Sequence, residues 1–514
     1  MSGLDHVPHV VYRYNDSRAE MTQYASGSWL HRNDIQMQAR RIPYNMSALR
    51  EKIITLDGGG STINRTIMKE GLSNKGFLFI LANGHQYFAR MPFSTAGPVS
   101  LTTQSEVATM AYLKQHTNIP LPKVLDWSAD SNNPIGAEYI ISEKMPGVSL
   151  YSMWESMSVA QHLRVVQKVA QICKQTYDLS FPGYGSIFPS DCSLNDDEKI
   201  DLGNGYCLGP NVGRDWWNSD AGEAELFQNI GFDHGPWKDM QAFQDAYFAS
   251  AFSRLPPLEH DCSKQPSFQG TVSEHYELIG QIQALFNDFH RFPEDMRRPT
   301  LLHPNLRLKQ ILVSESNPTE ITGVIDWQSA AVEPAVIYAM TLRPELQMRP
   351  TESVMANPPE VVDDMLATCN AFDAHLRQDM PAISEARTAF ENIPQLFYWS
   401  RLTWRRGVAE VREDLLSLIR LVGTRKPEIH AYSPAPDEIA LHAKEMEDFN
   451  LSLGVRNKVI AGTMCSPEGH VRRPWWELSL GKYRELFGFW MQMACGQQGM
   501  SREKAEQLWL FDAR

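Results

Sequence analysis

The segment LLHPNLRLKQILV, residues 301–313, places His303 and Asn305 within one short loop. The segment GVIDWQSA, residues 323–330, follows it and puts Asp326 at the end of an apolar run. A histidine, a polar residue two positions on and an amide five positions after that outline a loop for phosphoryl transfer. That reaction needs phosphates held in place, their charge neutralised by a metal, and an acceptor hydroxyl relieved of its proton. Because the Asn305 side chain is a neutral amide, it cannot take that proton.

Candidate phosphate-binding groups lie earlier in the chain. Gly58, Gly59 and Gly60 precede the segment STINRT, and their small size would let backbone amides approach a triphosphate; the alternative is a flexible turn. Arg90 ends the segment QYFAR, and its guanidinium could bind phosphates through two parallel N–H groups. Glu106, in the next predicted helix, could hold Arg90 in place, although an exposed pair of this kind would contribute little.

Two oxygen-bearing side chains could bind magnesium. Asp326 offers a carboxylate and Gln310 a carbonyl oxygen, although glutamine is one methylene longer than asparagine and magnesium tolerates distorted octahedral geometry poorly. Asp326 could instead be a buried carboxylate that caps a turn. Lys309 would add a positive charge close to the metal position. We expect His303 to organise the loop through backbone hydrogen bonds.

The elements that position these residues begin with a predicted antiparallel sheet. In GFLFILANGHQYFARMPF two apolar runs flank Asn83-Gly84, a strong hairpin signal. The segment LTTQSEVATMAYLKQH then predicts a helix that starts near Thr103, with Thr103 and Glu106 at capping-box spacing. A further buried strand, within GAEYIISEKMPG, should end before the Pro-Gly pair at 146–147.

From about residue 150 the pattern changes to long helical stretches. The sequence therefore predicts an α+β, two-lobed fold, with a small antiparallel-sheet lobe before a large, mainly helical lobe. We expect an N-terminal extension over residues 1–50 and the small lobe over 51–143. The large lobe should follow over 144–380, with a helical insert near 190–260, and a helical section packed on the large lobe should span 381–514.

Seven segments in this order resemble the aminoglycoside phosphotransferase family, a small-molecule branch of the protein-kinase-like fold, and most closely a largely fungal branch of it. They are the glycine turn, YFARMPF, TTQSEVATMAYL, PLPKVLDWSAD, GAEYIISEKMPG, LLHPNLRLKQILVS and ITGVIDWQSA. The resemblance implies that ATP and Mg²⁺ are the cofactors. It implies that Arg90 replaces the usual nucleotide-binding lysine and that Glu106 is the helix partner of Arg90. It also implies that Glu143 to Met145 form the hinge beside adenine and that Asp326 is a metal ligand.

The chain departs from that family at two positions of the loop. The family has His-x-Asp followed five residues later by Asn, whereas this chain has Asn305 and then Gln310. The amide at Asn305 removes general-base assistance, which is typically worth about 10² to 10⁴ in rate. Both changes favour a protein that keeps the cleft and has lost ordinary kinase activity.

Composition narrows the choice of binding partner and cellular compartment. The 514 residues carry a formal charge of −13, which disfavours binding to a nucleic-acid backbone. Seven scattered cysteines without a C-x-x-C pair favour a reducing compartment over a disulfide framework or a thiolate zinc site. No apolar run approaches the length of a membrane span. We expect a cytoplasmic protein without a clear transit peptide; the family resemblance makes a mitochondrial location the alternative.

Three functions remain open. The first is a pseudokinase-like or repurposed protein that binds a small molecule, or acts in biosynthesis, in the cleft between the lobes. The second is an active ATP- and Mg²⁺-dependent small-molecule kinase, supported by Arg90, Glu106 and Asp326. The third is a scaffold whose helical C-terminal section binds a protein. Trp216 and Trp217 could be core residues or could line an acceptor pocket.

Overall fold

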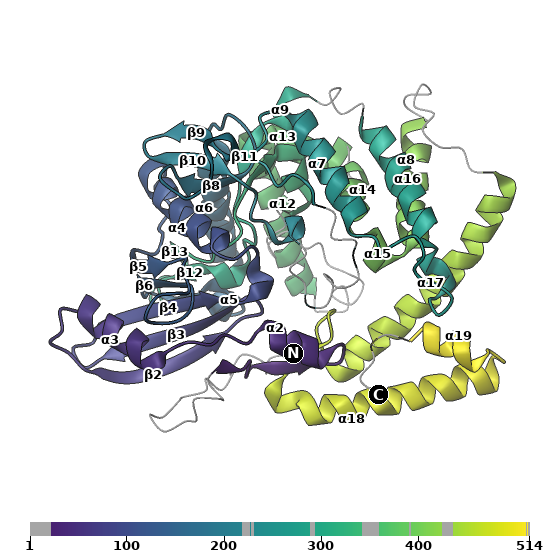
Figure 1. Ribbon diagram of the computed structural model, residues 1–514, viewed down its shortest axis with the longest axis horizontal. Coiled ribbons are helices and arrows are strands. Elements are labelled where there is room, and N and C mark those ends of the chain that lie inside the picture. The colour runs from purple at the N-terminus through teal and green to yellow at the C-terminus, as the bar shows by residue number, and fades with distance from the viewer. Residues whose placement is uncertain are drawn as a thin grey trace.

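Five antiparallel strands form the sheet of the smaller lobe, and mostly helices form the larger lobe (Figure 1). This is the predicted α+β, two-lobed arrangement. The computed structural model describes residues 22–217, 221, 227, 231–287, 293–341, 359–389, 392–423, 435–509 and 511. The first 21 positions of the predicted N-terminal extension lie outside the described residues.

The sheet of the smaller lobe has the strand order β2-β3-β4-β6-β5. Its strands, in chain order, are β2 (Ile63–Glu70), β3 (Asn74–Leu81), β4 (Gln86–Pro92), β5 (Val124–Ser128) and β6 (Tyr139–Glu143). The predicted hairpin is confirmed: the Leu81 N–H donates to His85 O at 2.9 Å, and Gly84 has a φ of +89°. The predicted strand that ends before residue 146 is also confirmed, as β6.

Helix α4 (Leu101–His116) follows β4, as predicted, but the predicted capping box is wrong. Thr103 Oγ1 does not cap the helix; it donates to Glu138 Oε2 at 2.7 Å. The other Glu138 oxygen accepts from the Ser100 N–H at 2.8 Å. A carboxylate from outside the helix thus binds the start of α4, which leaves Glu106 available for a different contact.

The N-terminal segment runs from beside the C-terminal helices, where α2 (Asn33–Ala39) lies, to the sheet of the smaller lobe, where α3 (Met46–Leu56) packs (Figure 1). It also contains β1 (Gly27–Trp29). The Asn45 side chain caps α3 by accepting from the N–H groups of Ser47 and Ala48. Two residues of α3, Leu49 and Ile53, are fully buried and pack it onto the core of the sheet.

The larger lobe surrounds one extensive apolar core that includes Trp216, Trp237 and Trp327. Its helices are α5 (Leu150–Trp154), α6 (Val159–Tyr177), α7 (Met240–Ser253), α8 (Val272–Phe286), α9 (Glu294–Arg297), α10 (Ala335–Thr341), α12 (Pro359–Asp379), α13 (Pro381–Ala389), α14 (Asn392–Ser400), α15 (Thr403–Arg406) and α16 (Val408–Gly423). Its short strands are β7 (Val148–Ser149), β8 (Ser186–Pro189), β9 (Ile200–Gly203), β10 (Tyr206–Gly209), β11 (Pro299–Leu301), β12 (Ile311–Val313), β13 (Ile321–Val324) and β14 (Val332–Pro334).

The final helices form a separate core that includes Val459, Tyr483 and Trp490. They comprise α17 (Pro436–Thr463), α18 (Trp476–Met491) and α19 (Arg502–Gln507), with the strand β15 (His470–Arg472) between the first two. Helices α13, α14 and α16 contribute to the core of the larger lobe, so the change of core falls between α16 and α17. No helix in the described part of the chain is long and apolar enough to span a bilayer.

Candidate functional site

Arg90, near the end of β4, connects the two lobes. Its guanidinium is in direct ion-pair contact with Glu106 of α4, and its Nη1 lies 3.1 Å from Asp326 Oδ1, after β13. The side chains of Arg90, Glu106 and Asp326 are 12%, 3% and 35% exposed, respectively. The predicted Arg90–Glu106 pair is therefore present and largely buried. One guanidinium joins a strand and a helix of the smaller lobe to a loop of the larger lobe.

Burial and charge act in opposite directions on this cluster. Desolvation raises the pKa of the Glu106 carboxyl, and the Arg90 guanidinium opposes that rise. Desolvation would lower the pKa of Arg90, but the two carboxylates outweigh it and raise that pKa. The shift on Glu106 favours its neutral form and the shift on Arg90 favours the charged pair. We take the pair as ionised, because an arginine keeps its proton and this one contacts Glu106 directly.

Asp326 lies in a sharp turn between the lobes. Its φ is +72°, in the left-handed region that aspartate enters more readily than most residues. Trp327 is fully buried, and its indole N–H donates to Val324 O at 3.2 Å. Ser329 Oγ donates to Ala96 O of the smaller lobe at 3.2 Å. Sparsely populated backbone conformations of this kind cluster at functional sites. The turn therefore holds a carboxylate at the junction of the lobes.

The loop that carries Asn305 is organised by His303. The Asn305 N–H donates to His303 Nδ1 at 3.1 Å, so the ring proton is on Nε2, which donates to Ile325 O at 3.0 Å. Burial lowers the pKa of His303 to about 4, which keeps the ring neutral at physiological pH. The exposed Asn305 side chain accepts through Oδ1 from Arg307 Nε at 2.8 Å. The position of the expected base is therefore an amide whose oxygen already has a partner.

Gln310 supplies an oxygen without a partner. Its Oε1 is buried and forms no hydrogen bond, and its backbone oxygen accepts from the Ile325 N–H at 3.0 Å, next to Asp326. Lys309 Nζ lies 4.5 Å from the centre of the Tyr151 ring. One carboxylate and one free amide oxygen fit magnesium, which usually takes one or two carboxylates together with waters and phosphates. Among the described residues no group of three or more His, Cys, Asp or Glu could hold a metal by itself.

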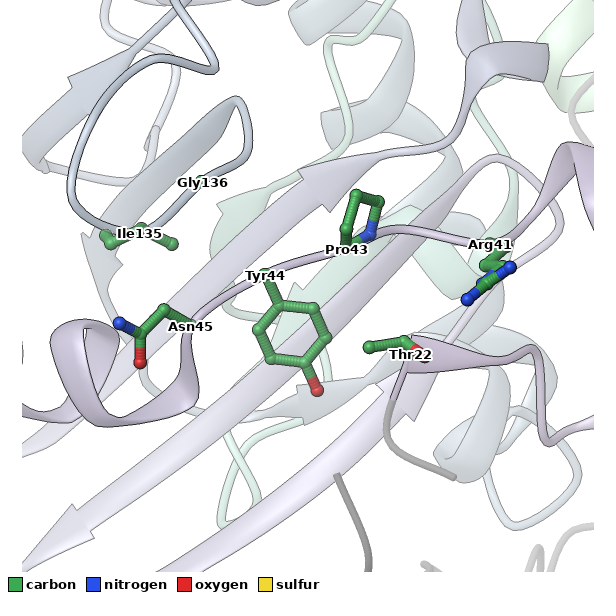
Figure 2. Close-up of a pocket in the computed structure, with 7 residues that line it drawn as sticks. All are labelled: Thr22, Arg41, Pro43, Tyr44, Asn45, Ile135 and Gly136. Atoms are coloured by element: carbon green, nitrogen blue, oxygen red, sulfur yellow. The ribbon is translucent and has the colours of Figure 1, made fainter. Parts of the chain in front are cut away.

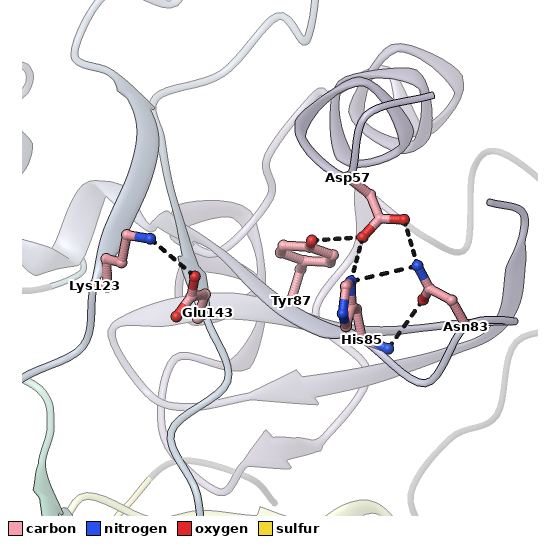
Figure 3. A network of polar contacts seen from close by, with 6 residues as sticks. All are labelled: Asp57, Asn83, His85, Tyr87, Lys123 and Glu143. Atoms are coloured by element: carbon pink, nitrogen blue, oxygen red, sulfur yellow. Dashed lines mark hydrogen bonds and ion pairs between the residues drawn. The ribbon is translucent and has the colours of Figure 1, made fainter. Parts of the chain in front are cut away.

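The predicted hinge, Glu143 to Met145, leaves β6 beside β4. Tyr87 pairs with Glu143, and the Glu143 carboxylate lies 3.2 Å from Lys123 Nζ, where both side chains are about half exposed (Figure 3). Met145 packs on Gly323 of β13, where an added Cβ would lie 2.8 Å from the Met145 methyl carbon. A depression of about 440 Å³ lies here, lined by Gly84, His85, Gln86, Tyr87, Glu143, Lys144 and Pro146.

A polar network beside this depression ties α3 to the sheet. Asp57 Oδ1 lies 2.6 Å from His85 Nδ1 and accepts from the Tyr87 hydroxyl at 2.7 Å, while its Oδ2 accepts from Asn83 Nδ2 at 2.7 Å (Figure 3). The hydrogen bond from His85 is the largest of several that lower the pKa of Asp57. The Asp57 carboxylate, at the end of α3, thus binds side chains of the hairpin, which is a structural role.

The predicted phosphate-binding glycines, residues 58–60, connect α3 to β2 and lie away from Arg90. The strand that follows them begins where Ile63 pairs with Leu81, whereas Arg90 pairs with Gly76 on the same strand β3. Five residues of β3 separate those levels, or roughly 16 Å at about 3.3 Å per residue. Local pattern could not reveal this separation, because it depends on strand register.

The glycine turn nearest to Arg90 joins β2 to β3 and was missed in the sequence. The Gly71 N–H donates to Asn74 O at 2.9 Å, and Ser73 O accepts from the Phe93 N–H just beyond the end of β4. Phe88, also on β4, covers the sheet beside Arg90: a Cβ added to Gly76 would lie 2.5 Å from its ring. The available signal was a glycine in EGLSNKG, between two apolar runs.

The tryptophans considered for an acceptor pocket have different positions. Trp216 is 1% exposed and packs on Trp237, with 4.5 Å between ring centres, so it is a core residue. Its indole N–H donates to Glu333 Oε1 at 3.1 Å. Trp217 is half-buried and stacks on His234 at 3.8 Å. Only Trp217 therefore remains a candidate for contact with a ligand.

A second depression, of about 510 Å³, lies on the smaller lobe and contains none of the predicted site residues (Figure 2). The backbone of Asn45 closes one side by donating to Ile135 O at 2.6 Å. The lining residues are Thr22, Arg41, Pro43, Tyr44, Asn45, Ile135 and Gly136.

A family model described as the phosphotransferase enzyme family matches residues 65–342, more than half of the chain. A subtelomeric hrmA-associated cluster protein of Aspergillus fumigatus is 28% identical over 306 residues, which cover 53% of this chain and 58% of that protein. The altered inheritance of mitochondria protein 9, mitochondrial, of Candida glabrata is 25% identical over 309 residues, which cover 50% of this chain and 47% of that protein. The match thus spans about half the length of these relatives.

Among solved structures, a thermostable mutant of an aminoglycoside phosphotransferase in its apo form matches 72% of this chain and 98% of its own. Its sequence identity is 16% and its TM-score is 0.40.

Proposed function

The chain belongs to the phosphotransferase enzyme family, and we propose that it binds a small molecule in the cleft between its lobes without transferring phosphoryl groups at an ordinary kinase rate. The observation that carries this proposal is Asn305, at the position where the family resemblance implies an aspartate. Its side chain cannot be ionised, and its Oδ1 accepts from Arg307. Loss of general-base assistance costs about 10² to 10⁴ in rate.

The proposed ligand includes a nucleotide. Arg90 would bind its phosphates and keep Glu106 as a counter-ion, while the segment from Glu143 to Met145 would border the adenine. Asp326 and Gln310 would hold magnesium, since Gln310 Oε1 is buried without a partner. Bound magnesium would neutralise phosphate charge. Arg90 contacts Asp326 directly and supplies a positive charge at that carboxylate.

An active small-molecule phosphotransferase is the second candidate. The observation that favours it is the assembled Arg90, Glu106 and Asp326 cluster, because a loose transition state depends on held phosphates and neutralised charge more than on a base. The two candidates agree on nucleotide binding and differ in the rate of transfer.

A thermal-shift measurement with and without Mg·ATP tests binding, because a ligand that binds only the folded state stabilises it. We expect a rise of a few degrees with Mg·ATP and a smaller rise with ATP and EDTA. Restoring the family residues with Asn305→Asp and Gln310→Asn should then raise ATP hydrolysis by about 10²-fold over the parent. Asn132→Asp, at an exposed loop position, is the matched control and should leave hydrolysis unchanged. Ordinary kinase turnover by the unmodified protein would contradict the proposal.

We also propose a cytoplasmic location, with mitochondria as the alternative raised by the name of the Candida relative. The formal charge of −13 supports a partner other than nucleic acid. A fluorescent-protein fusion carried in cells with a mitochondrial dye distinguishes the two locations.

A further inference from the structure

The turn between β2 and β3 is held from outside by Arg40. Arg40 is 7% exposed, its guanidinium lies 4.4 Å from the centre of the Trp29 ring, and its Nε donates to Leu72 O at 2.9 Å. Its Nη1 donates to Gln36 O and to the Gln36 side-chain oxygen. The tip of the hairpin nearest to Arg90 is therefore fixed by a buried side chain of the N-terminal segment.

A buried ion pair at the base of the same turn forms hydrogen bonds with the backbone of the N-terminal segment. Lys75 Nζ lies 2.8 Å from Glu70 Oε1, and both side chains are fully buried. Lys75 also donates to Gln23 O at 2.7 Å. Glu70 Oε2 accepts from the N–H groups of Ala25 and Ser26 at 2.8 and 3.0 Å. Removal of the segment would leave two buried charged groups without these partners, which is costly.

The N-terminal segment is in turn paired with the far end of the chain. β1 and β15 form a two-stranded antiparallel sheet in which Gly27 pairs with Arg472 and Trp29 pairs with His470. The contact is close, because a Cβ added at Gly27 would lie 2.2 Å from Val471 O. Only glycine fits there without a shift of the β15 backbone.

The C-terminal helices are anchored on the larger lobe. Arg412 of α16 pairs with Glu445 of α17 at 3.0 Å, and Ser267 Oγ of the larger lobe donates to Asp448 at 2.6 Å. His442 Nε2 lies 2.8 Å from a Glu413 carboxylate oxygen. Figure 1 shows α17 descending from the larger lobe and α18 lying beside the N-terminal segment. A continuous series of contacts thus leads from the hairpin turn to the larger lobe without passing through the hinge.

We propose that residues 23–40, β15 and α17 form a strap that joins the lobes outside the hinge and fixes the β2–β3 turn beside Arg90. Arg40 is the positioning residue for that turn. The consequence for ligand binding rests on the proposed function: a fixed turn and a fixed Arg90 preorganise the cleft, so less conformational freedom is lost on binding.

Hydrogen–deuterium exchange of the full chain tests the strap without any ligand. We expect Arg40→Ala to speed exchange of the amides at residues 71–74 by at least about tenfold, since exchange reports local opening. Arg40→Lys keeps the charge and should be intermediate. Arg41→Ala removes the same charge at an exposed neighbouring position and should leave the turn unchanged. Unchanged exchange in a folded Arg40→Ala variant overturns the strap.

Gly27→Ala gives an independent test, because it disrupts the β1–β15 pairing and leaves Arg40 in place. It should also speed exchange at residues 71–74. If neither variant folds, exchange in the unmodified protein decides: amides of β1 and of the turn should exchange at rates within roughly threefold, as one cooperative unit. Exchange of the turn at the rate of an unstructured peptide overturns the proposal.

Nucleotide affinity measures the positioning role of Arg40. At a temperature where both proteins are folded, the Kd for Mg·ATP should rise about tenfold in Arg40→Ala and stay unchanged in Arg41→Ala. An unchanged Kd together with faster turn exchange overturns the positioning role. If the unmodified protein binds no Mg·ATP, the proposed function fails, and the exchange experiment still decides the strap.

Discussion

Replacing Arg90 with methionine should destabilise the protein by about 3–5 kcal/mol at pH 7.5, because it leaves a buried carboxylate without its partner. The Glu106 side chain is 3% exposed, and its Oε2 already has no hydrogen-bond partner, so it cannot be rehydrated in place. The Asp326 side chain is 35% exposed, so its carboxylate can rotate towards solvent. Asp326→Asn should therefore cost about 1 kcal/mol or less. Adding Glu106→Gln to Arg90→Met should recover about 2 kcal/mol.

The same variant should show a distinctive pH dependence. Burial raises the pKa of Glu106, and the rise grows when the opposing Arg90 guanidinium is removed. A carboxyl with a raised pKa in the folded state binds its proton more readily when folded, so stability is present at low pH and is lost as the pH rises through that pKa. The deficit of Arg90→Met relative to the unmodified protein should shrink between pH 7.5 and pH 5.5. Urea unfolding followed by tryptophan fluorescence measures it.

Lys123→Met is the matched control for this experiment. Lys123 pairs with Glu143 at 3.2 Å, but the two side chains are 59% and 52% exposed, so we expect a loss below about 0.5 kcal/mol that does not vary with pH. The reasoning is refuted if Arg90→Met costs no more than the control. It is equally refuted if Asp326→Asn costs as much as Arg90→Met, because burial would then not decide the magnitude.

Three further predictions concern single positions. The folded-state pKa of His303 is lowered to about 4, so its contribution to stability is lost as the pH falls from about 6.5; in His303→Gln, urea midpoints measured between pH 6.5 and 5 should fall less steeply. Gly76→Ala should cost about 1–3 kcal/mol, because the added Cβ would lie 2.5 Å from the Phe88 ring, and Phe88→Leu should relieve part of that cost in a double-mutant cycle. Gly60→Ala should leave both stability and the Mg·ATP thermal shift unchanged, since a Cβ there has nothing within 4 Å; a lost shift would return this glycine to the site.

Local sequence signals predicted the elements of the smaller lobe. The Asn83–Gly84 turn works through the positive φ of Gly84, and apolar periodicity indicated α4. The pairing of β1 with β15 had no such signal, because the two strands come from opposite ends of the chain. Strand partners so distant are chosen by tertiary packing, which no short window of sequence contains.

In the candidate site, too, contacts between neighbouring elements could be predicted and contacts between distant segments could not. Arg90 and Glu106 lie on successive elements, so their pairing follows from the strand–helix order. The capping role inferred for Thr103 was wrong because Glu138, from a distant strand connection, supplies both acceptors at the start of α4. The contact of Arg90 with Asp326 depends on how the lobes are joined, and spacing along the chain does not encode that distance.

The hydrogen bonds that His303 makes around Asn305 do not depend on the side chain at position 305. His303 bonds to the backbone of Ile325 and accepts from the Asn305 backbone N–H, and neither contact involves the Asn305 side chain. We therefore expect the loop to keep this geometry when position 305 carries a carboxylate, which would supply the proton acceptor that the amide lacks. The conformation of the loop and its ability to accept a proton are separable, because backbone contacts determine the conformation and one ionisable side chain determines the proton transfer. For this reason Asn305→Asp is expected to supply a proton acceptor without repacking; Arg307 Nε, now bonded to Asn305 Oδ1, would pair with the new carboxylate and lower its pKa.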